Sequence, residues 1–140
     1  MSNKQKLTLD EHRRLGAALA TIRNGCASAD RLNELKKGSA TLRRLLRVEK
    51  DIDRLRRKLD SLLAEQHPGV DGRSIYYGDP LAMEGRTLDA LHVRLSYEVG
   101  ALVLTDRVPA PLIDLYLRCE RSMFALKTST ADHPEDARRS

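Results

Sequence analysis

The sequence predicts an all-α protein, because three observations agree. Leu and Ala dominate the apolar residues, and the chain has one Phe, no Trp and few β-branched residues, which is typical of helices. Apolar residues recur every three or four positions in four separate segments. Charged residues make up 32% of the chain, enough to solvate the outer faces of amphipathic helices. We therefore expect an antiparallel four-helix bundle built from two helical hairpins, or else an extended coiled-coil hairpin of the first two helices standing on the other two.

The first helix is expected over about residues 9–37. Thr8 is a favourable N-cap, and Glu11 follows at the spacing of a capping box. A break at Asn24 and Gly25 is the alternative, because both residue types favour turns. Gly and Ser follow the helix, and so short a connection predicts that the next helix returns antiparallel.

The second helix, over about residues 40–66, carries two opposite faces. Its apolar seam alternates three and four residues apart at Leu45, Val48, Ile52, Leu55, Leu59 and Leu62. A basic row recurs on the other face at Arg43, Arg47, Lys50, Arg54 and Arg57. The row is about 21 Å long at the helical rise per residue, so it is a candidate surface for nucleic acid or an acidic partner.

A solvated outer face is the alternative interpretation of the basic row, since Asp51, Asp53 and Asp60 are interleaved with it. Asp53 also has Arg57 at the favourable i,i+4 spacing. No aromatic residue interrupts the row, so we expect contact with a nucleic acid backbone and no base stacking.

Residues 67–86 are expected to form an irregular linker, because they include four Gly and two Pro. Ser74 to Tyr77 are interpreted as a short extended piece, and Pro80 to Glu84 as one helical turn. Tyr76 and Tyr77 either anchor this linker to the bundle or contact a partner.

The last two helices are expected over about residues 88–105 and 111–127, with Thr87 as the N-cap of the first and Pro111 opening the second. The polar tail, residues 128–140, is expected to be disordered. Residues 1–127 are therefore interpreted as a single helical domain.

Charge and hydropathy indicate the environment and the partner class. Residues 1–66 carry 16 Lys and Arg against 9 Asp and Glu, whereas residues 67–140 carry 9 against 11. The basic first half favours nucleic acid, an anionic surface or an acidic protein as the partner. We expect a cytoplasmic protein without membrane insertion, because no signal peptide and no apolar run long enough to span a bilayer are present. Cys26 and Cys119 are expected to be buried and reduced.

One short motif suggests chemistry. Arg86 and His92 have the spacing R-x5-H at the start of the third expected helix. This resembles the active-site motif of the HEPN family of helical-bundle ribonucleases. The resemblance implies metal-independent RNA cleavage, usually across a dimer, in which Arg86 neutralises phosphate charge and His92 moves a proton. The alternative is a partly buried His92 beside the core and an Arg at the helix cap.

No other catalytic or cofactor pattern is present. The four His residues are dispersed, neither Cys has a partner at metal-ligand spacing, and no nucleophile elbow or phosphate-binding glycine loop occurs, so we expect no metal and no cofactor. The leading hypothesis is a small non-enzymatic binding protein, a regulatory or adaptor module that self-associates into a homo-oligomer or binds a protein partner. The alternatives are a nucleic-acid-binding protein that uses the basic row and a HEPN-like ribonuclease.

Overall fold

The computed structural model describes residues 6–26, 40–77 and 87–132, and within these ranges the regular elements are helices, with no strand. The all-α prediction is confirmed for this part of the chain. The elements are α1 (Leu9–Cys26), α3 (Ala40–Gln66), α4 (Gly72–Tyr76), α5 (Leu88–Arg94), the π-helix η1 (Leu95–Gly100), α6 (Ala101–Val103) and α7 (Ala110–Asp132). The prediction of a single domain stays a prediction.

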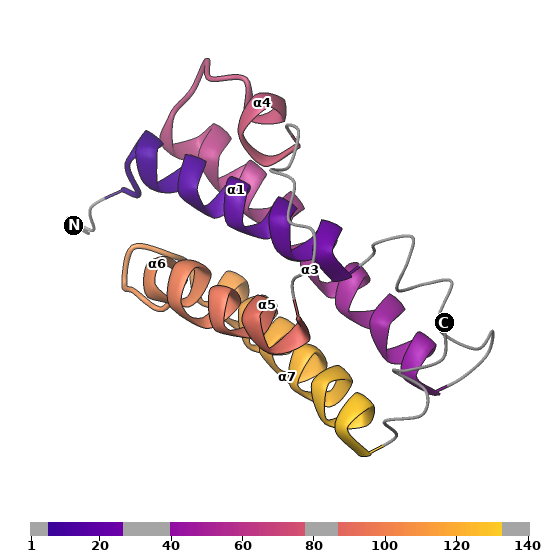
Figure 1. Cartoon of the computed structure of the whole chain (residues 1–140). Helices are drawn as coiled ribbons and strands as arrows, with labels where there is room; N and C mark the ends of the chain where they lie inside the picture. The colour runs from indigo at the N-terminus through magenta and orange to yellow at the C-terminus, as the bar shows by residue number, and fades with distance from the viewer. Residues whose placement is uncertain (1–5, 27–39, 78–86, 133–140) are drawn as a thin grey trace.

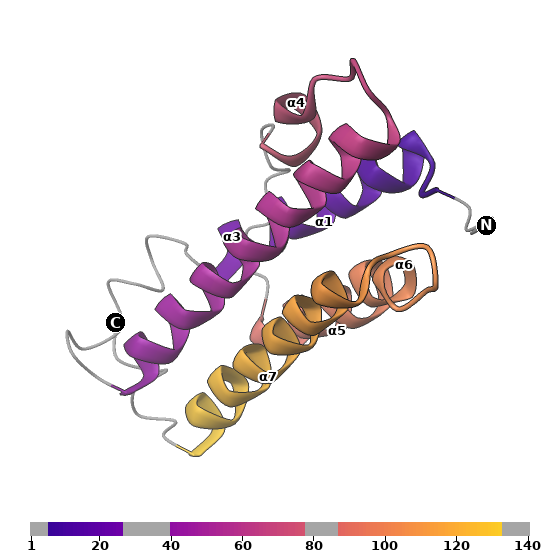
Figure 2. The ribbon, with the colours of Figure 1, turned by 180° about the vertical axis from the view of Figure 1, so that it is seen from behind.

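The long helices run past one another in alternating directions (Figures 1 and 2). α3 returns past α1, and α7 returns along the length of α3. The start of α1 lies beside the end of α3, where His67 Nε2 donates to the Leu7 carbonyl at 2.7 Å. α1 also packs against α4 and η1, and the α5–α6 segment packs against α7. The elements therefore share one hydrophobic cluster.

The apolar seam of α3 is confirmed. Five of its predicted residues are fully buried and the sixth, Leu62, is 6% exposed. The seam can be buried from two sides because α1 and α7 both pack on α3. Every seam residue belongs to the shared cluster, so α3 is the central element of the described structure.

Two boundaries differ from the expectation. For the first helix no comparison is possible, because α1 is helical through Asn24 and Gly25 to Cys26 and residues 27–39 lie outside the described part, so both the expected end near residue 37 and the alternative break stay predictions. The third helix ends at Val103 and contains a π turn. α7 reaches Asp132, so the disordered tail is wrong for residues 128–132, and residues 133–140 lie outside the described part. A helix packed along a partner extends easily, since each added residue gains a hydrogen bond without a new nucleation step.

The linker is more ordered than its composition suggests. Ser74 to Tyr76 are helical in α4, so the expected extended piece is wrong. Asp71 caps this short helix, because its side chain accepts from the Arg73 N–H at 3.0 Å. The main chain of α4 meets α1 at Gly16, where any Cβ would overlap the carbonyl of Ile75. The expected turn at 80–84 lies outside the described residues.

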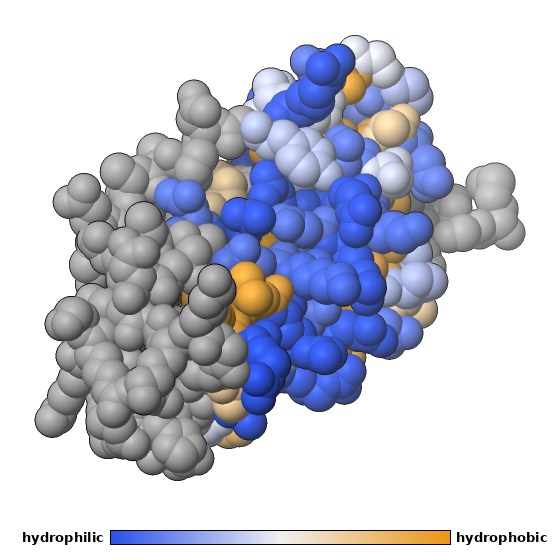
Figure 3. Space-filling view, turned by 90° about the vertical axis from the view of Figure 1, so that its right-hand side faces the viewer, coloured by the Kyte–Doolittle hydropathy of each residue, from blue (hydrophilic) through white to orange (hydrophobic). Residues whose placement is uncertain are grey.

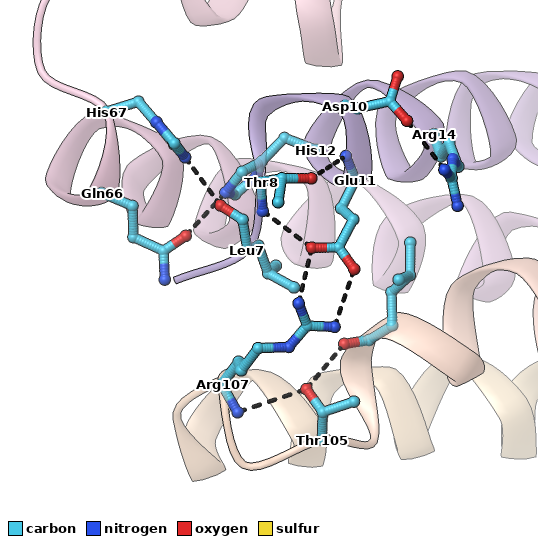
Figure 4. A network of polar contacts seen from close by, with 11 residues as sticks. Leu7, Thr8, Asp10, Glu11, His12, Arg14, Gln66, His67, Thr105 and Arg107 are labelled. Carbon is cyan, nitrogen blue, oxygen red and sulfur yellow. Dashed lines mark hydrogen bonds and ion pairs between the residues drawn. The ribbon is translucent and has the colours of Figure 1, made fainter. Parts of the chain in front are cut away.

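The predicted capping box is confirmed and has a second role (Figure 4). The Thr8 N–H donates to Glu11 Oε1 at 2.8 Å, and the Glu11 N–H donates to Thr8 Oγ1 at 3.0 Å. Arg107, which follows α6, donates to both Glu11 carboxylate oxygens at 2.7 and 2.9 Å. The Arg107 hydrogen bonds hold the pKa of Glu11 at about 2, although burial opposes the shift. Glu11 thus joins the start of α1 to the α6–α7 connection.

Candidate nucleic-acid interface

The basic row lies on the outer face of α3. Arg43, Arg47, Lys50 and Arg57 are exposed, and Arg54 is half-buried. The opposite face of the same helix is the buried seam, so helical geometry directs these side chains away from the core. Hydrophilic residues also cover most of the described surface on one broad side of the molecule, where hydrophobic residues form only small patches (Figure 3).

Two of the three interleaved acids do not neutralise the row. Asp51 is buried, with 4% of the residue exposed, and its Oδ2 has no hydrogen-bond partner. Asp53 instead accepts from Arg23 of α1 at 2.8 Å and from Arg56 at 3.4 Å. The i,i+4 pair expected between Asp53 and Arg57 is absent from the ion pairs of the described residues.

Asp51 lies close enough to Cys119 of α7 to affect its thiol. Burial, and then the negative charge of Asp51, raises the pKa of the Cys119 thiol on α7. Cys119 and Cys26 are both buried and free of disulfides, as expected. A thiol with a raised pKa is a poor nucleophile, so Cys119 acts as a core residue. Asp51 therefore lies at the buried α3–α7 contact and not on the exposed face that carries the basic row.

A hollow of about 500 Å³ opens beside the row. Its lining residues come from α1, α3 and the end of α4, and they are Arg23, Lys50, Asp53, Arg56, Arg57 and Tyr77. The Arg56 guanidinium lies over the Tyr77 ring, 4.8 Å from its centroid. Tyr77 remains 43% exposed. The row itself contains no aromatic residue, but α4 folds back and brings beside it a ring that is 20 positions from Arg57 in the sequence. The expectation of no base stacking stays a prediction.

Tyr76 has the opposite environment from Tyr77. It is fully buried, so the expectation of a partner contact is wrong for this residue, and the anchoring alternative is confirmed. Its hydroxyl lies 2.6 Å from His12 Nδ1, and His12 Nε2 lies 2.9 Å from Gln66 Oε1. The amide oxygen of Gln66 only accepts, so Nε2 carries the proton and Nδ1 accepts from Tyr76. Figure 4 shows His12 and Gln66 close together where α1 begins and α3 ends.

The motif that resembles the HEPN family is described only in part. Arg86 lies outside the described residues. His92 is half-buried, with Nε2 2.7 Å from Glu120 Oε1 and Nδ1 3.0 Å from Lys127 Nζ. An ammonium group can only donate, so Nδ1 accepts and the Nε2 proton goes to Glu120. Both ring nitrogens are therefore occupied, which favours the interpretation of His92 as a partly buried structural residue, and ribonuclease activity stays a prediction.

The Glu120 carboxylate accepts hydrogen bonds from His92, Ser96 and Tyr116. Burial raises the pKa of its carboxyl group, but donors at Tyr116, Ser96 and His92 together lower that pKa below its usual range. Tyr116 donates at 2.5 Å and Ser96 at 2.8 Å to the same oxygen. The network therefore joins α5, η1 and α7 and holds an ionised carboxylate. Asp89 pairs with Lys127 at 3.0 Å, and the described residues contain no group of His, Cys, Asp and Glu that could hold a metal ion.

Comparisons with protein-family models, with curated proteins and with solved structures find no match to this chain. No helix in the described ranges has the length and apolar character needed to cross a membrane. The functional proposal therefore rests on the residues of the chain itself, and the basic row with its adjoining hollow is the strongest candidate site.

Proposed function

We propose that this protein is a non-enzymatic, cytoplasmic binding module that holds a nucleic acid by its phosphate backbone through the basic row of α3. In the same proposal, α1, α3, the α5–α6 segment and α7 are the four helices of an antiparallel bundle that presents this row. The observation that carries the proposal is the placement of the acids. Asp51 is buried and Asp53 is held by Arg23 and Arg56, so no described acid forms an ion pair with Arg47, Lys50 or Arg57.

The geometry of the row suits a phosphate backbone. Arg47 and Arg57 are ten positions apart on one helix, which is about 15 Å along the axis. One strand of a duplex presents about four phosphates over that length. Arg and Lys side chains that contact phosphates fix position without reading sequence. Binding should therefore be tolerant of sequence and should weaken steeply as salt rises.

Fluorescence anisotropy with labelled single-stranded and duplex oligonucleotides tests this function. The row variant is Arg47→Glu with Lys50→Glu, and the charge-matched control is Arg118→Glu with Arg121→Glu, two exposed positions on α7. We expect the row variant to lose at least tenfold in affinity and its salt slope to fall by about 2, one for each lost phosphate contact. The control should change much less. No binding by the natural protein at low salt, or equal losses in both variants, would contradict the proposal.

A second candidate function, self-association, is favoured by a different surface. Tyr97 of η1 is 76% exposed, which is unusual for a large ring. It borders a groove of about 350 Å³ between α1 and the η1–α6 segment, whose wall includes Ala17, Ala18 and Leu102. We propose that a second copy of the chain supplies the ring that fills this groove, in a two-fold arrangement.

Light scattering across a range of protein concentrations tests self-association. Tyr97→Arg should shift the protein to monomer, because the ring that fills the groove is lost and the new guanidinium would meet Arg14 and Arg94 in the groove wall. Phe124→Arg, at an exposed ring on α7, is the matched control and should leave the mass unchanged. A natural protein that is monomeric at every concentration rules out this second function and leaves the basic row unaffected.

A further inference from the structure

The hollow beside the basic row has features that a phosphate-binding row does not need. Tyr77 projects a partly exposed ring into a space whose other walls are charged. An aromatic ring adds little to phosphate binding, whereas bases of any type stack on one. The inference below rests on the proposed function and specifies the form of nucleic acid that the site takes.

The Tyr77 ring is held in place before any ligand arrives. The guanidinium of Arg56 lies over the ring. Arg56 is itself fixed, because its Nε donates to the Tyr76 carbonyl at 3.0 Å and its Nη1 to Asp53 at 3.4 Å. Only 11% of the Arg56 side chain is exposed. A ring supported in this way loses little conformational freedom when a base stacks on it.

The four cations that line the hollow differ in whether an acid pairs with them. Asp53 is shared by Arg23 and Arg56, so these cations are partly neutralised. Lys50 and Arg57 also line the hollow and form no ion pair with an acid in the described ranges. A phosphate is therefore attracted to Lys50 and Arg57 and repelled by the carboxylate of Asp53. The volume of about 500 Å³ lies within the range of about 300–1,000 Å³ that small-ligand sites occupy.

We propose that this hollow holds one nucleotide of a single-stranded nucleic acid, with its base stacked against Tyr77 and its phosphates bound by Lys50 and Arg57. A base within a duplex is paired and stacked on its neighbours, so its face cannot reach a ring on the protein. The site therefore favours single strands over duplexes. The rest of the basic row extends the contact along the backbone of the same strand.

Anisotropy with one single-stranded oligonucleotide, as RNA and as DNA, and with the duplex of the same sequence tests the inference. Tyr77→Ala should weaken single-strand binding about tenfold and leave the duplex affinity unchanged. Its salt slope should stay at the natural value, because no phosphate contact is lost. Tyr77→Phe keeps the ring and should bind within about twofold of the natural protein. Circular dichroism of each variant checks that the helices are intact.

The outcomes separate this inference from the function on which it rests. Equal single-strand affinity for Tyr77→Ala and the natural protein, or equal weakening on single strand and duplex, overturns the stacking site but leaves backbone binding in place. A fall in salt slope for Tyr77→Ala also overturns it, since the ring would then be acting through the phosphate contacts. No binding of any oligonucleotide at low salt overturns both proposals.

Discussion

At the scale of single residues, buried polar side chains fix where α1, α3 and α4 meet. His12 is fully buried and has a hydrogen-bond partner at each ring nitrogen. Burial lowers the pKa of His12, although the hydrogen bond to Gln66 opposes the shift, so the ring is neutral at pH 7. A histidine whose folded pKa is lowered destabilises the fold as pH falls below its ordinary value of about 6.5. The same network buries Tyr76 and leaves Tyr77 at the surface.

Tyr76→Phe tests this network. The change removes the only donor to His12 Nδ1 in the described structure and leaves a buried acceptor unsatisfied. We expect a loss of about 1–3 kcal/mol in the free energy of unfolding, measured by urea denaturation at pH 7.5. Tyr77→Phe, one position away and exposed, is the control and should change that free energy by less than about 0.5 kcal/mol. Equal stabilities of the two variants would contradict the assigned network.

Acid denaturation tests the Glu11–Arg107 contact. The folded pKa of Glu11 is about 2, against an ordinary value of 4.5. The contact therefore contributes its full stability above about pH 4.5 and loses it progressively as the pH falls toward about 2, a loss of at most about 3 kcal/mol. Glu11→Gln should lower stability at pH 7 and flatten the pH dependence between pH 4.5 and 2.5. Parallel pH profiles for the variant and the natural protein would show that Arg107 does not act through this charge.

At the scale of elements, the close approach of α4 to α1 places Tyr77 at the basic row. Gly16→Ala would normally stabilise a helix by about 1 kcal/mol. Here the new Cβ would overlap the Ile75 carbonyl, so we expect lower stability and weaker single-strand binding, because α4 must move. Asn24→Ala, at an exposed position in the same helix, should be neutral or stabilising. A stabilised Gly16→Ala variant with full binding would contradict this role of α4.

Features that depend on residue spacing within one helix were predictable from the sequence. The Thr8–Glu11 capping box and the seam of α3 were predictable, because each depends on spacing within one helix. The basic row was predictable as a pattern, but the net charge of its surface was not. Asp53 pairs with Arg23 of α1, and no spacing within α3 predicts a partner from another helix. α4 was not predicted, because the Gly and Pro residues around it favour turns, although Asp71 is a residue type typical of helix N-caps.

Other features arise only when helices meet. The π turn of η1 includes Gly100, which lies against the Tyr116 hydroxyl, and no periodicity marks such a turn in advance. The contacts of Glu11 with Arg107 and of His92 with Glu120 join residues 96 and 28 positions apart. Residue types alone do not select such partners. The helices, the basic row and Tyr77 as a candidate contact were therefore predictable from the sequence, but the position of Tyr77 beside the row was not.

At the scale of the whole molecule, the excess of basic residues in the first half of the chain appears as an exposed basic face on α3. The basic first half of the chain supplies α3, and the buried seam of that helix faces α1 and α7. The positive charge is therefore displayed outward, while Asp51 is buried and Asp53 is paired with Arg23 and Arg56. A binding module needs such a preformed charged face on a rigid element, because contacts then form without ordering a loop.

Lysine footprinting tests this account most directly. The measurement is the acetylation rate of each lysine, determined by mass spectrometry with and without a saturating single-stranded oligonucleotide. Lys50 is exposed in the basic row, and Lys6, also exposed, donates to the Gln66 carbonyl at the other end of α3. We predict that the oligonucleotide slows acetylation of Lys50 several-fold and leaves Lys6 unchanged, because a bound phosphate shields the Lys50 ammonium. An unchanged rate at Lys50 in a complex that forms would contradict the assignment of α3 as the binding face.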